Sequence, residues 1–189
     1  MVRLAWALLK VALSAVVRGH AVQAVPAGPG ILGIAPFVEG TATTLLRVYN
    51  PVRRPHLYTT DGNEYQVLGA NGWSQDGGVG KLLGVGGKVL GRPTIALYRL
   101  HSPVLGKHLF TTDANEYAVL ATFGWVQDGV VGYMSERANT DPNVVTKAFM
   151  RLYQPALRQH LYTTDANEVN VLTTQAGWTN EEAVGYWLE

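Results

Sequence analysis

The sequence predicts a β-rich α+β protein in which three ββαβ repeats close around a pseudo-threefold axis, giving a trefoil-like or small-propeller-like body. The first observation is a nearly identical stretch, His-Leu-Tyr/Phe-Thr-Thr-Asp-x-Asn-Glu, that begins at His56, His108 and His160 with a spacing of 52 residues. A fixed period of this size indicates one supersecondary unit copied in tandem. The second observation is that one such unit buries too little apolar surface to fold alone, whereas three can share a core. An open linear array is the alternative.

Each repeat opens with an apolar strand that contains an arginine and is followed by a proline. These strands are expected at 45–49, 97–101 and 149–153, with the prolines two residues further on. Proline fixes φ and lacks an N–H, so it ends a strand and opens a turn. The following His-Leu-Tyr/Phe-Thr-Thr stretch favours a second strand, which predicts a β-hairpin. The three arginines are expected either to bind an acidic ligand or to pair with acidic residues of a neighbouring helix: Arg47, Arg99 and Arg151.

A short helix follows each hairpin. Asp61, like Asp113 and Asp165, fits an N-cap, and the glutamate three residues later can complete a capping box. The same two carboxylates also admit an acid–base pair for glycoside cleavage. A glycine at 72, 124 and 177 fits the left-handed position after a helix, and a tryptophan follows it directly. A last strand, at 79–83, 131–134 and 184–188, completes each unit.

The composition is that of a globular protein and excludes several classes. Of 189 residues, 47% are hydrophobic and 15% are charged, which is not the composition of a disordered chain. Cysteine is absent, so disulfides and thiolate metal sites are excluded. No motif calls for a cofactor, and no metal site is expected.

Residues 1–24 resemble a secretory signal peptide. A short basic start precedes an apolar run from Leu4 to Val17, and small residues precede a potential cut after Ala24. Lys10 interrupts the apolar run, and an amphipathic helix on a membrane surface is the alternative interpretation. The run is too short and too charged for a transmembrane helix. We therefore expect a secreted, extracellular protein with no membrane span in its mature chain.

Removal of that peptide leaves no excess of positive charge. Without Arg3, Lys10 and Arg18, 12 basic and 14 acidic residues remain. A general nucleic-acid binder carries a cationic surplus, so no nucleic-acid partner is expected.

The remaining chain divides into an N-terminal segment and one domain. The N-terminal segment covers 25–44 and contains a possible strand at 31–38, and the domain covers 45–189. The three repeats of the domain are expected at 45–84 (segment 1), 95–136 (segment 2) and 147–189 (segment 3).

The ordered pattern Tyr/Leu-Arg-x-Tyr-x-Pro, His-Leu-Tyr/Phe-Thr-Thr, Asn-Glu, Gly-Trp, Val-Gly-Tyr resembles a repeat of secreted bacterial and fungal proteins. That family is catalogued as a domain of unknown function and often accompanies extracellular hydrolase domains. The resemblance covers about residues 45 to 189. It implies a secreted accessory module that holds a surface or a glycan, and it implies no catalytic residue. The family more often has serine at the helix cap, where this chain has aspartate.

Candidate ligand-binding residues are the repeated aromatic and imidazole side chains near the hairpin turn and after the helix. Tryptophan and tyrosine faces either fill cores or stack on sugars, and the repeated histidines either anchor their hairpins, contact a ligand or converge on a metal. The candidates are Trp73, Trp125, Trp178, His56, His108, His160, Tyr49, His101 and Tyr153.

Triplication favours a multivalent binding surface over a single catalytic centre. We therefore expect a non-catalytic, lectin-like module that binds carbohydrate or a component of the cell surface or cell wall. One alternative is an extracellular hydrolase with a histidine-containing site at the pseudo-threefold axis. Another is a structural, self-assembling extracellular protein. No serine lies in a nucleophile elbow, and the oligomeric state is not predicted.

Overall fold

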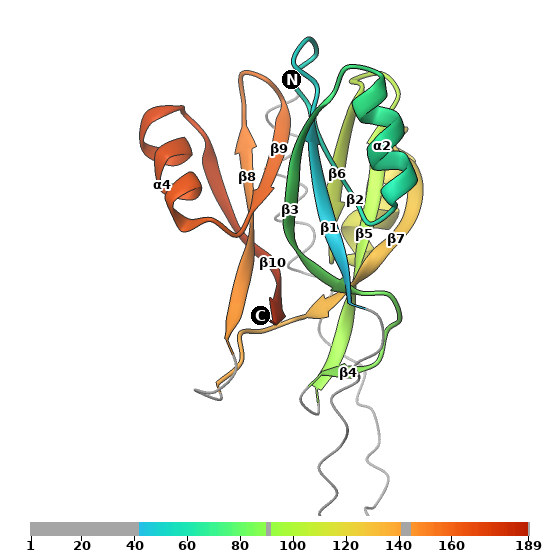
Figure 1. The fold of residues 1–189 in the computed structure, drawn as a ribbon, viewed down its shortest axis with the longest axis vertical. Coiled ribbons are helices and arrows are strands. Elements are labelled where there is room, and N and C mark those ends of the chain that lie inside the picture. Colours follow the sequence, from blue (N-terminus) through green and yellow to red (C-terminus); the bar gives the residue numbers. More distant parts are fainter. Residues whose placement is uncertain (1–41, 90–91, 141–144, 189) are drawn as a thin grey trace, which may run out of the picture. The chain divides into compact units, whose positions relative to one another are not determined.

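The computed structural model describes residues 42–89, 92–140 and 145–188, all of which belong to one compact unit (Figure 1). The predicted signal peptide and the expected strand at 31–38 lie outside these described residues. None of the described helices is long and apolar enough to span a bilayer.

The described part of the chain consists of helices of nine or ten residues and strands of two to eleven residues. Segment 1 contains β1 (Ala42–Tyr49), β2 (His56–Thr59), α2 (Gly62–Ala70) and β3 (Ser74–Leu83), followed by β4 (Lys88–Val89). Segment 2 contains β5 (Arg92–Ser102), β6 (Lys107–Thr111), α3 (Ala114–Thr122) and β7 (Val126–Ser135). Segment 3 contains β8 (Thr146–Gln154), β9 (Gln159–Thr163), α4 (Ala166–Gln175) and β10 (Thr179–Leu188). The predicted β-rich character is confirmed.

The prediction of three ββαβ repeats closed around a pseudo-threefold axis, trefoil-like or small-propeller-like, is wrong. The strands instead join one ten-stranded sheet, in which seven strands follow the order β2-β1-β3-β7-β10-β8-β9. The other three lie beside this path: β5 pairs with β7, and β4 and β6 each pair with β5. The pairings between described strands are antiparallel.

The length of the last strand in each segment explains this difference. β3, β7 and β10 each have 10 residues and begin well before the predicted short strands. Their C-terminal ends pair with one another: β3 meets β7 with Leu83 opposite Tyr133, and β10 meets β7 with Tyr186 opposite Ser135. Because an exposed strand end offers unpaired N–H and C=O groups, such a contact continues the sheet from one segment into the next.

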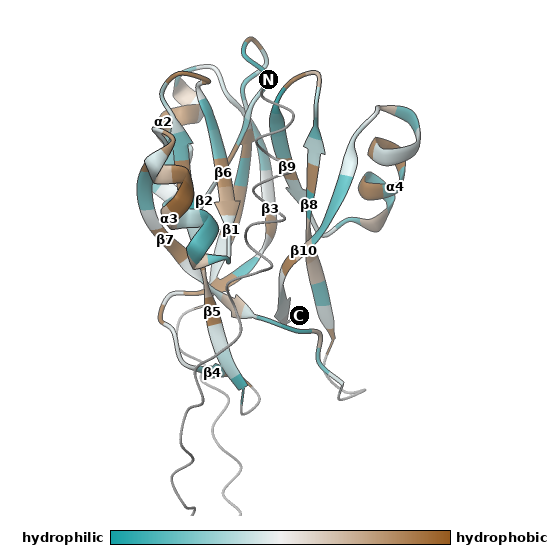
Figure 2. Cartoon of the chain, turned by 180° about the vertical axis from the view of Figure 1, so that it is seen from behind, coloured by the Kyte–Doolittle hydropathy of each residue, from teal (hydrophilic) through white to brown (hydrophobic). Residues whose placement is uncertain are grey.

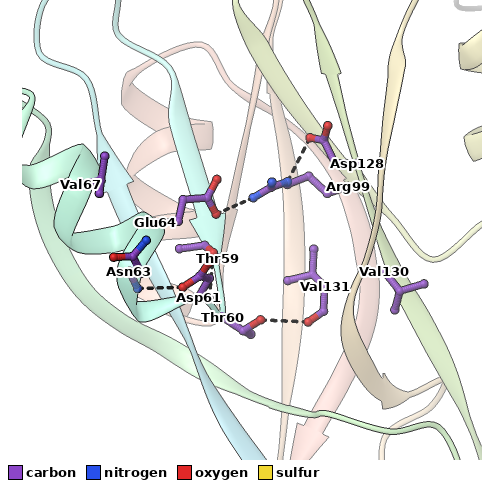
Figure 3. A pocket seen from close by; sticks show the side chains of 10 residues that line it. All are labelled: Thr59, Thr60, Asp61, Asn63, Glu64, Val67, Arg99, Asp128, Val130 and Val131. Atoms are coloured by element: carbon purple, nitrogen blue, oxygen red, sulfur yellow. Dashed lines mark hydrogen bonds and ion pairs between the residues drawn. The ribbon is translucent and has the colours of Figure 1, made fainter.

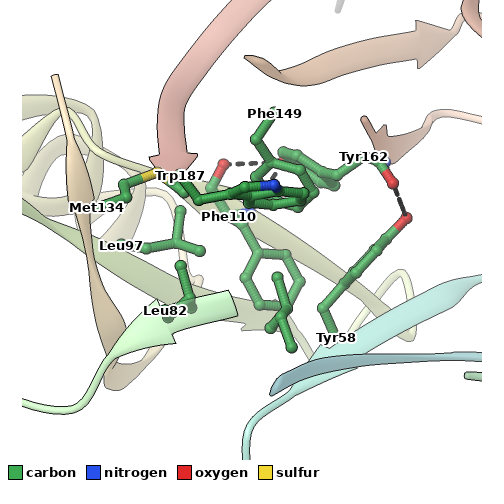
Figure 4. Packing of buried hydrophobic residues seen from close by; sticks show 9 residues of the cluster. Tyr58, Leu82, Leu97, Phe110, Met134, Phe149, Tyr162 and Trp187 are labelled. Carbon is green, nitrogen blue, oxygen red and sulfur yellow. Dashed lines mark hydrogen bonds between the residues drawn. The ribbon is translucent and has the colours of Figure 1, made fainter. Parts of the chain in front are cut away.

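The core is an aromatic cluster to which all three segments contribute (Figure 4). Tyr58, Phe110 and Tyr162 are each 1% exposed and meet edge to face, with ring centroids 5.3 to 5.5 Å apart. Tyr58 OH donates to the Tyr162 carbonyl at 2.8 Å, and Tyr162 OH donates to the Phe110 carbonyl at 2.8 Å. In addition, Tyr58 OH accepts the backbone N–H of Tyr162, and Tyr162 OH accepts the backbone N–H of Phe110. The buried phenols therefore satisfy main-chain groups of other segments and are structural.

Hydrophobic and hydrophilic residues are interspersed along the strands (Figure 2), and the inward positions pack tightly. Trp187 is 5% exposed and lies against Phe149 at a ring distance of 5.2 Å. A Cβ at Gly80 would overlap the Trp187 indole. Glycine at this position thus makes room for the largest side chain of the core.

The aspartate caps are confirmed in all three helices. Asp61 accepts from the N–H of Asn63 at 2.8 Å, and the other two caps repeat this contact. The glycines at 72, 124 and 177 have φ of 85°, 85° and 67°, which confirms the predicted left-handed positions. The capping box is wrong, because the N–H of Asp61 donates to Thr59 Oγ1 at 3.0 Å, and the glutamates face arginines of other segments.

Candidate functional site

The predicted tyrosines and histidines of each hairpin face one another across its two strands. Tyr49 lies opposite His56, His101 opposite His108, and Tyr153 opposite His160. The ring centroids of these pairs are 4.8, 6.0 and 4.9 Å apart. These residues were separate candidates in the sequence, and the strand register joins them into three ring pairs beside the hairpin turns.

One of these pairs belongs to a surface cavity of about 420 Å³ between segments 1 and 2. Trp73 comes from the start of β3, whereas His101 and His108 come from the hairpin of β5 and β6. Three nominated residues from two segments therefore share one cavity. Its lining consists of Asn50, Arg53, Pro55, Trp73, His101, Ser102, Pro103, Gly106, Lys107 and His108.

The cavity is lined by two cationic side chains, and one of its two histidines, His108, is neutral. Arg53 and Lys107 line it, and no carboxylate is among its lining residues. Burial, and secondly the neighbouring Arg99, lowers the pKa of His108 to about 4. His108 is therefore an uncharged imidazole at neutral pH, with one nitrogen able to donate and the other able to accept. Its Nδ1 is buried and has no hydrogen-bond partner among the described residues.

His101 is the more accessible imidazole, and a carboxylate orients it. Its side chain is 36% exposed, and its Nδ1 lies 2.7 Å from Asp128 Oδ1. The other oxygen of Asp128 accepts from Arg99 Nε at 3.0 Å. This chain of contacts fixes the ring against β7 and leaves its remaining nitrogen available to a ligand.

The other nominated residues lie elsewhere. Trp125 and Trp178 are half-buried like Trp73, and none of the three belongs to the buried core. His160 is buried, with Nε2 3.1 Å from Glu181 Oε2, and burial lowers its pKa despite this carboxylate. Burial also lowers the pKa of His56 to about 4.

The histidines do not form a metal centre with acidic residues in the described ranges. No group of three or more His, Asp or Glu side chains there has the arrangement of a metal site. The pairs of each hairpin instead contact aromatic rings or carboxylates.

The repeated arginines pair with acidic residues of a neighbouring helix, which was one of the two predicted roles. Arg99 Nη1 lies 2.8 Å from Glu64 Oε2 of α2, and Figure 3 shows Arg99 between Glu64 and Asp128 at a second cavity of about 370 Å³. Each of the three contacts joins two segments. Arg99–Glu64 joins segment 2 to segment 1, Arg47–Glu168 joins segment 1 to segment 3, and Arg151–Glu116 joins segment 3 to segment 2. Their engagement in ion pairs explains the repeated glutamates without acid–base catalysis.

The polar part of the cavity lining, in and beside the turns, was not predicted from the sequence. Asn50 and Arg53 lie in the first hairpin turn, and Lys107 is the first residue of β6, directly after the second turn. The three segments differ in sequence at these positions. A search confined to repeated positions passes over such residues. The available signal was the concentration of basic residues between the prolines and the histidines.

These features define a β-rich protein with an aromatic, imidazole-containing cavity between neighbouring hairpins. The chain belongs to the family described as a domain of unknown function (DUF5648), whose profile matches residues 44–188. Comparison with curated proteins and with solved structures gives no significant match.

Proposed function

We propose that this chain is a secreted, non-catalytic module that binds carbohydrate or a cell-surface component through the cavity lined by Trp73, His101 and His108. The observation that carries the proposal is the meeting of these three side chains, from two segments, in one cavity of about 420 Å³. A pocket of this size suits a small ligand or one to two sugar units of a longer chain.

The lining has the chemistry that sugar recognition requires. An indole offers an apolar face to the C–H groups of a sugar ring. Asn50, Ser102 and the neutral imidazole of His108 offer uncharged donors and acceptors for hydroxyl groups. A half-buried Trp73 remains accessible for such stacking.

The related side chains of the other segments support multivalent binding. Trp125 and Trp178 follow α3 and α4 as Trp73 follows α2, and the Tyr49–His56 and Tyr153–His160 pairs lie in their own hairpins. Weak sites that share one polymer gain avidity without any strong single contact. The resemblance to repeats of secreted proteins fits an extracellular setting for such a module.

The test is retention of the purified protein on insoluble cell-wall polysaccharides. Trp73→Ala is expected to weaken retention by about tenfold, the value of one lost aromatic contact, and Trp125→Ala and Trp178→Ala to weaken it in further steps. The matched control is Phe123→Ala, which removes an aromatic ring that is 69% exposed and lies outside the cavity lining. Retention that ignores all three tryptophans, in variants with unchanged circular dichroism, contradicts the proposal.

One observation favours the alternative, an extracellular hydrolase. Asp128 orients His101 at 2.7 Å, the relation of a general base to its orienting group, and Ser102 lines the same cavity. A hydrolase requires that His101→Ala abolishes turnover of ester, glycoside or peptide substrates in a folded protein. Absence of turnover by the wild type in those panels removes this alternative.

A further inference from the structure

The three hairpin turns gather at one end of the described sheet (Figure 1). They connect β1 to β2, β5 to β6, and β8 to β9. Arg53 of the first turn and Lys107, which begins β6 directly after the second turn, line the same cavity. Lys107 Nζ also donates to the carbonyl of Leu157 in the third turn. The turns therefore form a continuous surface, here named the turn surface.

The turn surface exposes aliphatic side chains. Val52 is 87% exposed, Val104 92%, Leu105 41% and Leu157 37%. Isolated exposed aliphatic residues are ordinary, but a gathering of them on adjoining loops marks a contact surface.

The same turns carry positive charge without any acidic residue. Residues 50–55, 102–107 and 154–159 contain no Asp or Glu, whereas they contain four cations: Arg53, Arg54, Lys107 and Arg158. Burial and the nearby charge of Arg158 lower the pKa of Lys107. This cationic group sits on a chain with a net charge of only +1, so the charge of the surface is local.

Internal hydrogen bonds hold each turn in shape. Asn50 Oδ1 accepts the N–H groups of Val52 and Arg53 at 3.0 and 2.8 Å. Ser102 Oγ accepts the N–H of Leu105 at 3.2 Å, and Gln154 Oε1 accepts that of Ala156 at 3.1 Å. Fixed turns lose little conformational entropy when they bind.

Two of the arginines occupy backbone positions that favour glycine. Arg54 and Arg158 have φ of 64° and 50°, and segment 2 has Gly106 at the corresponding place with φ of 61°. A left-handed conformation strains any L-residue with a Cβ. Residues held in such positions cluster at binding sites and ligand clamps, which favours a functional role for these two turns.

We infer that the turn surface docks onto a membrane bearing anionic phospholipids, with Val52 and Val104 entering the interface and the four cations contacting lipid phosphates. Basic residues next to exposed aliphatic ones are the combination that an anionic lipid surface selects, since charge attracts the protein and apolar groups insert. A soluble acidic polysaccharide would satisfy the cations but leave the valines in water. This surface is additional to the sugar-binding role of the cavity, although Arg53 and Lys107 take part in both.

The test uses the full chain and its lack of cysteine. Val104→Cys is labelled with an environment-sensitive fluorophore and mixed with vesicles of phosphatidylcholine, with or without phosphatidylglycerol. The matched control is Val85→Cys, which is 74% exposed and follows the end of β3 that pairs with the start of β1, away from the turns. We expect a blue shift of the Val104 label only with phosphatidylglycerol, reversed by high salt, and no shift of the Val85 label.

A double variant separates the arginines from the fold. Arg54→Gly with Arg158→Gly is expected to weaken vesicle binding about thirtyfold, from the loss of two interfacial cations, while thermal stability stays equal or rises. No shift of the Val104 label, an equal shift of both labels, or a shift with soluble polygalacturonate equal to that with vesicles overturns the inference. Polysaccharide retention by the double variant reports on the cavity separately, because neither arginine lines it.

Discussion

The ion pair of Arg151 with Glu116 is expected to stabilise the fold more than its two counterparts. Arg151 Nη1 lies 2.9 Å from Glu116 Oε2, and both side chains are only 12% exposed. In the Arg99–Glu64 pair the exposed fractions are 20% and 29%. The same chemical contact therefore occurs at two degrees of burial within one protein, and Glu→Gln removes the charge while conserving the shape.

The magnitude follows from that burial. Removing one partner of a fully buried pair costs roughly 3 to 5 kcal/mol, but Arg151 keeps Glu181 Oε2 at 3.0 Å, and an amide oxygen still accepts from it. We therefore expect Glu116→Gln to lower the free energy of unfolding by about 2 kcal/mol. For Glu64→Gln the expected loss is about 0.5 to 1 kcal/mol, the range of exposed pairs.

Urea unfolding followed by circular dichroism measures both losses by linear extrapolation. Glu136→Gln is the control, because Glu136 is 64% exposed, its pair with Arg137 spans 3.8 Å, and its loss should be near zero. If Glu64→Gln costs as much as Glu116→Gln, burial does not set the strength of these contacts, and the reasoning fails.

Three further perturbations test the core and the histidines. Lowering the pH should destabilise the protein between about 6.5 and 4, because the folded pKa of His56 and of His108 is about 4 against an ordinary 6.5, so the unfolded chain binds protons first. We expect a loss of about 3 kcal/mol per histidine by pH 4, and a flat urea midpoint over this range would contradict it. Gly80→Ala should lower the free energy of unfolding by about 2 kcal/mol, because its Cβ would overlap the core indole. Gly62→Ala should raise it by about 0.5 kcal/mol, because a Cβ at this helical position meets nothing within 4 Å. Equal melting temperatures of the two variants would reject this account of the packing. Tyr162→Phe should cost about 2 kcal/mol in urea unfolding, because it leaves a buried N–H and carbonyl without their hydroxyl partner, and a loss below about 0.5 kcal/mol would show that these hydrogen bonds contribute little.

The local features of the fold followed from the sequence because short-range chemistry determines them. An aspartate before a helix accepts the free N–H groups of the first turn, and a glycine after it adopts a positive φ, whatever the surrounding structure. The capping glutamate failed because a guanidinium from another segment, such as Arg99 facing Glu64, competes for the carboxylate. The sequence indicates that an arginine recurs, but only the packing of the segments determines which acid it meets.

The connected sheet and the cavity could not be predicted from the sequence, because they depend on long-range contacts that the repeated residues do not indicate. One pairing, Leu83 opposite Tyr133, carries the sheet from β3 into β7. Arg53, in the first turn, and Lys107, at the start of β6, line the cavity at positions where the segments differ in sequence. By contrast, the sequence alone nominates Trp73, His101 and His108 as candidates, because large aromatic and imidazole side chains recur at fixed positions in it.

The most direct test of the binding cavity is a titration of ¹⁵N-tryptophan-labelled protein with soluble cell-wall oligosaccharides, monitored at the indole N–H signals. Trp187 is 5% exposed and serves as the internal reference, whereas Trp73 lines the cavity. The account predicts that the Trp73 signal shifts in a saturable manner while the Trp187 signal stays in place, and that His108→Ala weakens the response. Saturable binding that leaves the Trp73 signal unmoved, or no binding of any oligosaccharide, would contradict it.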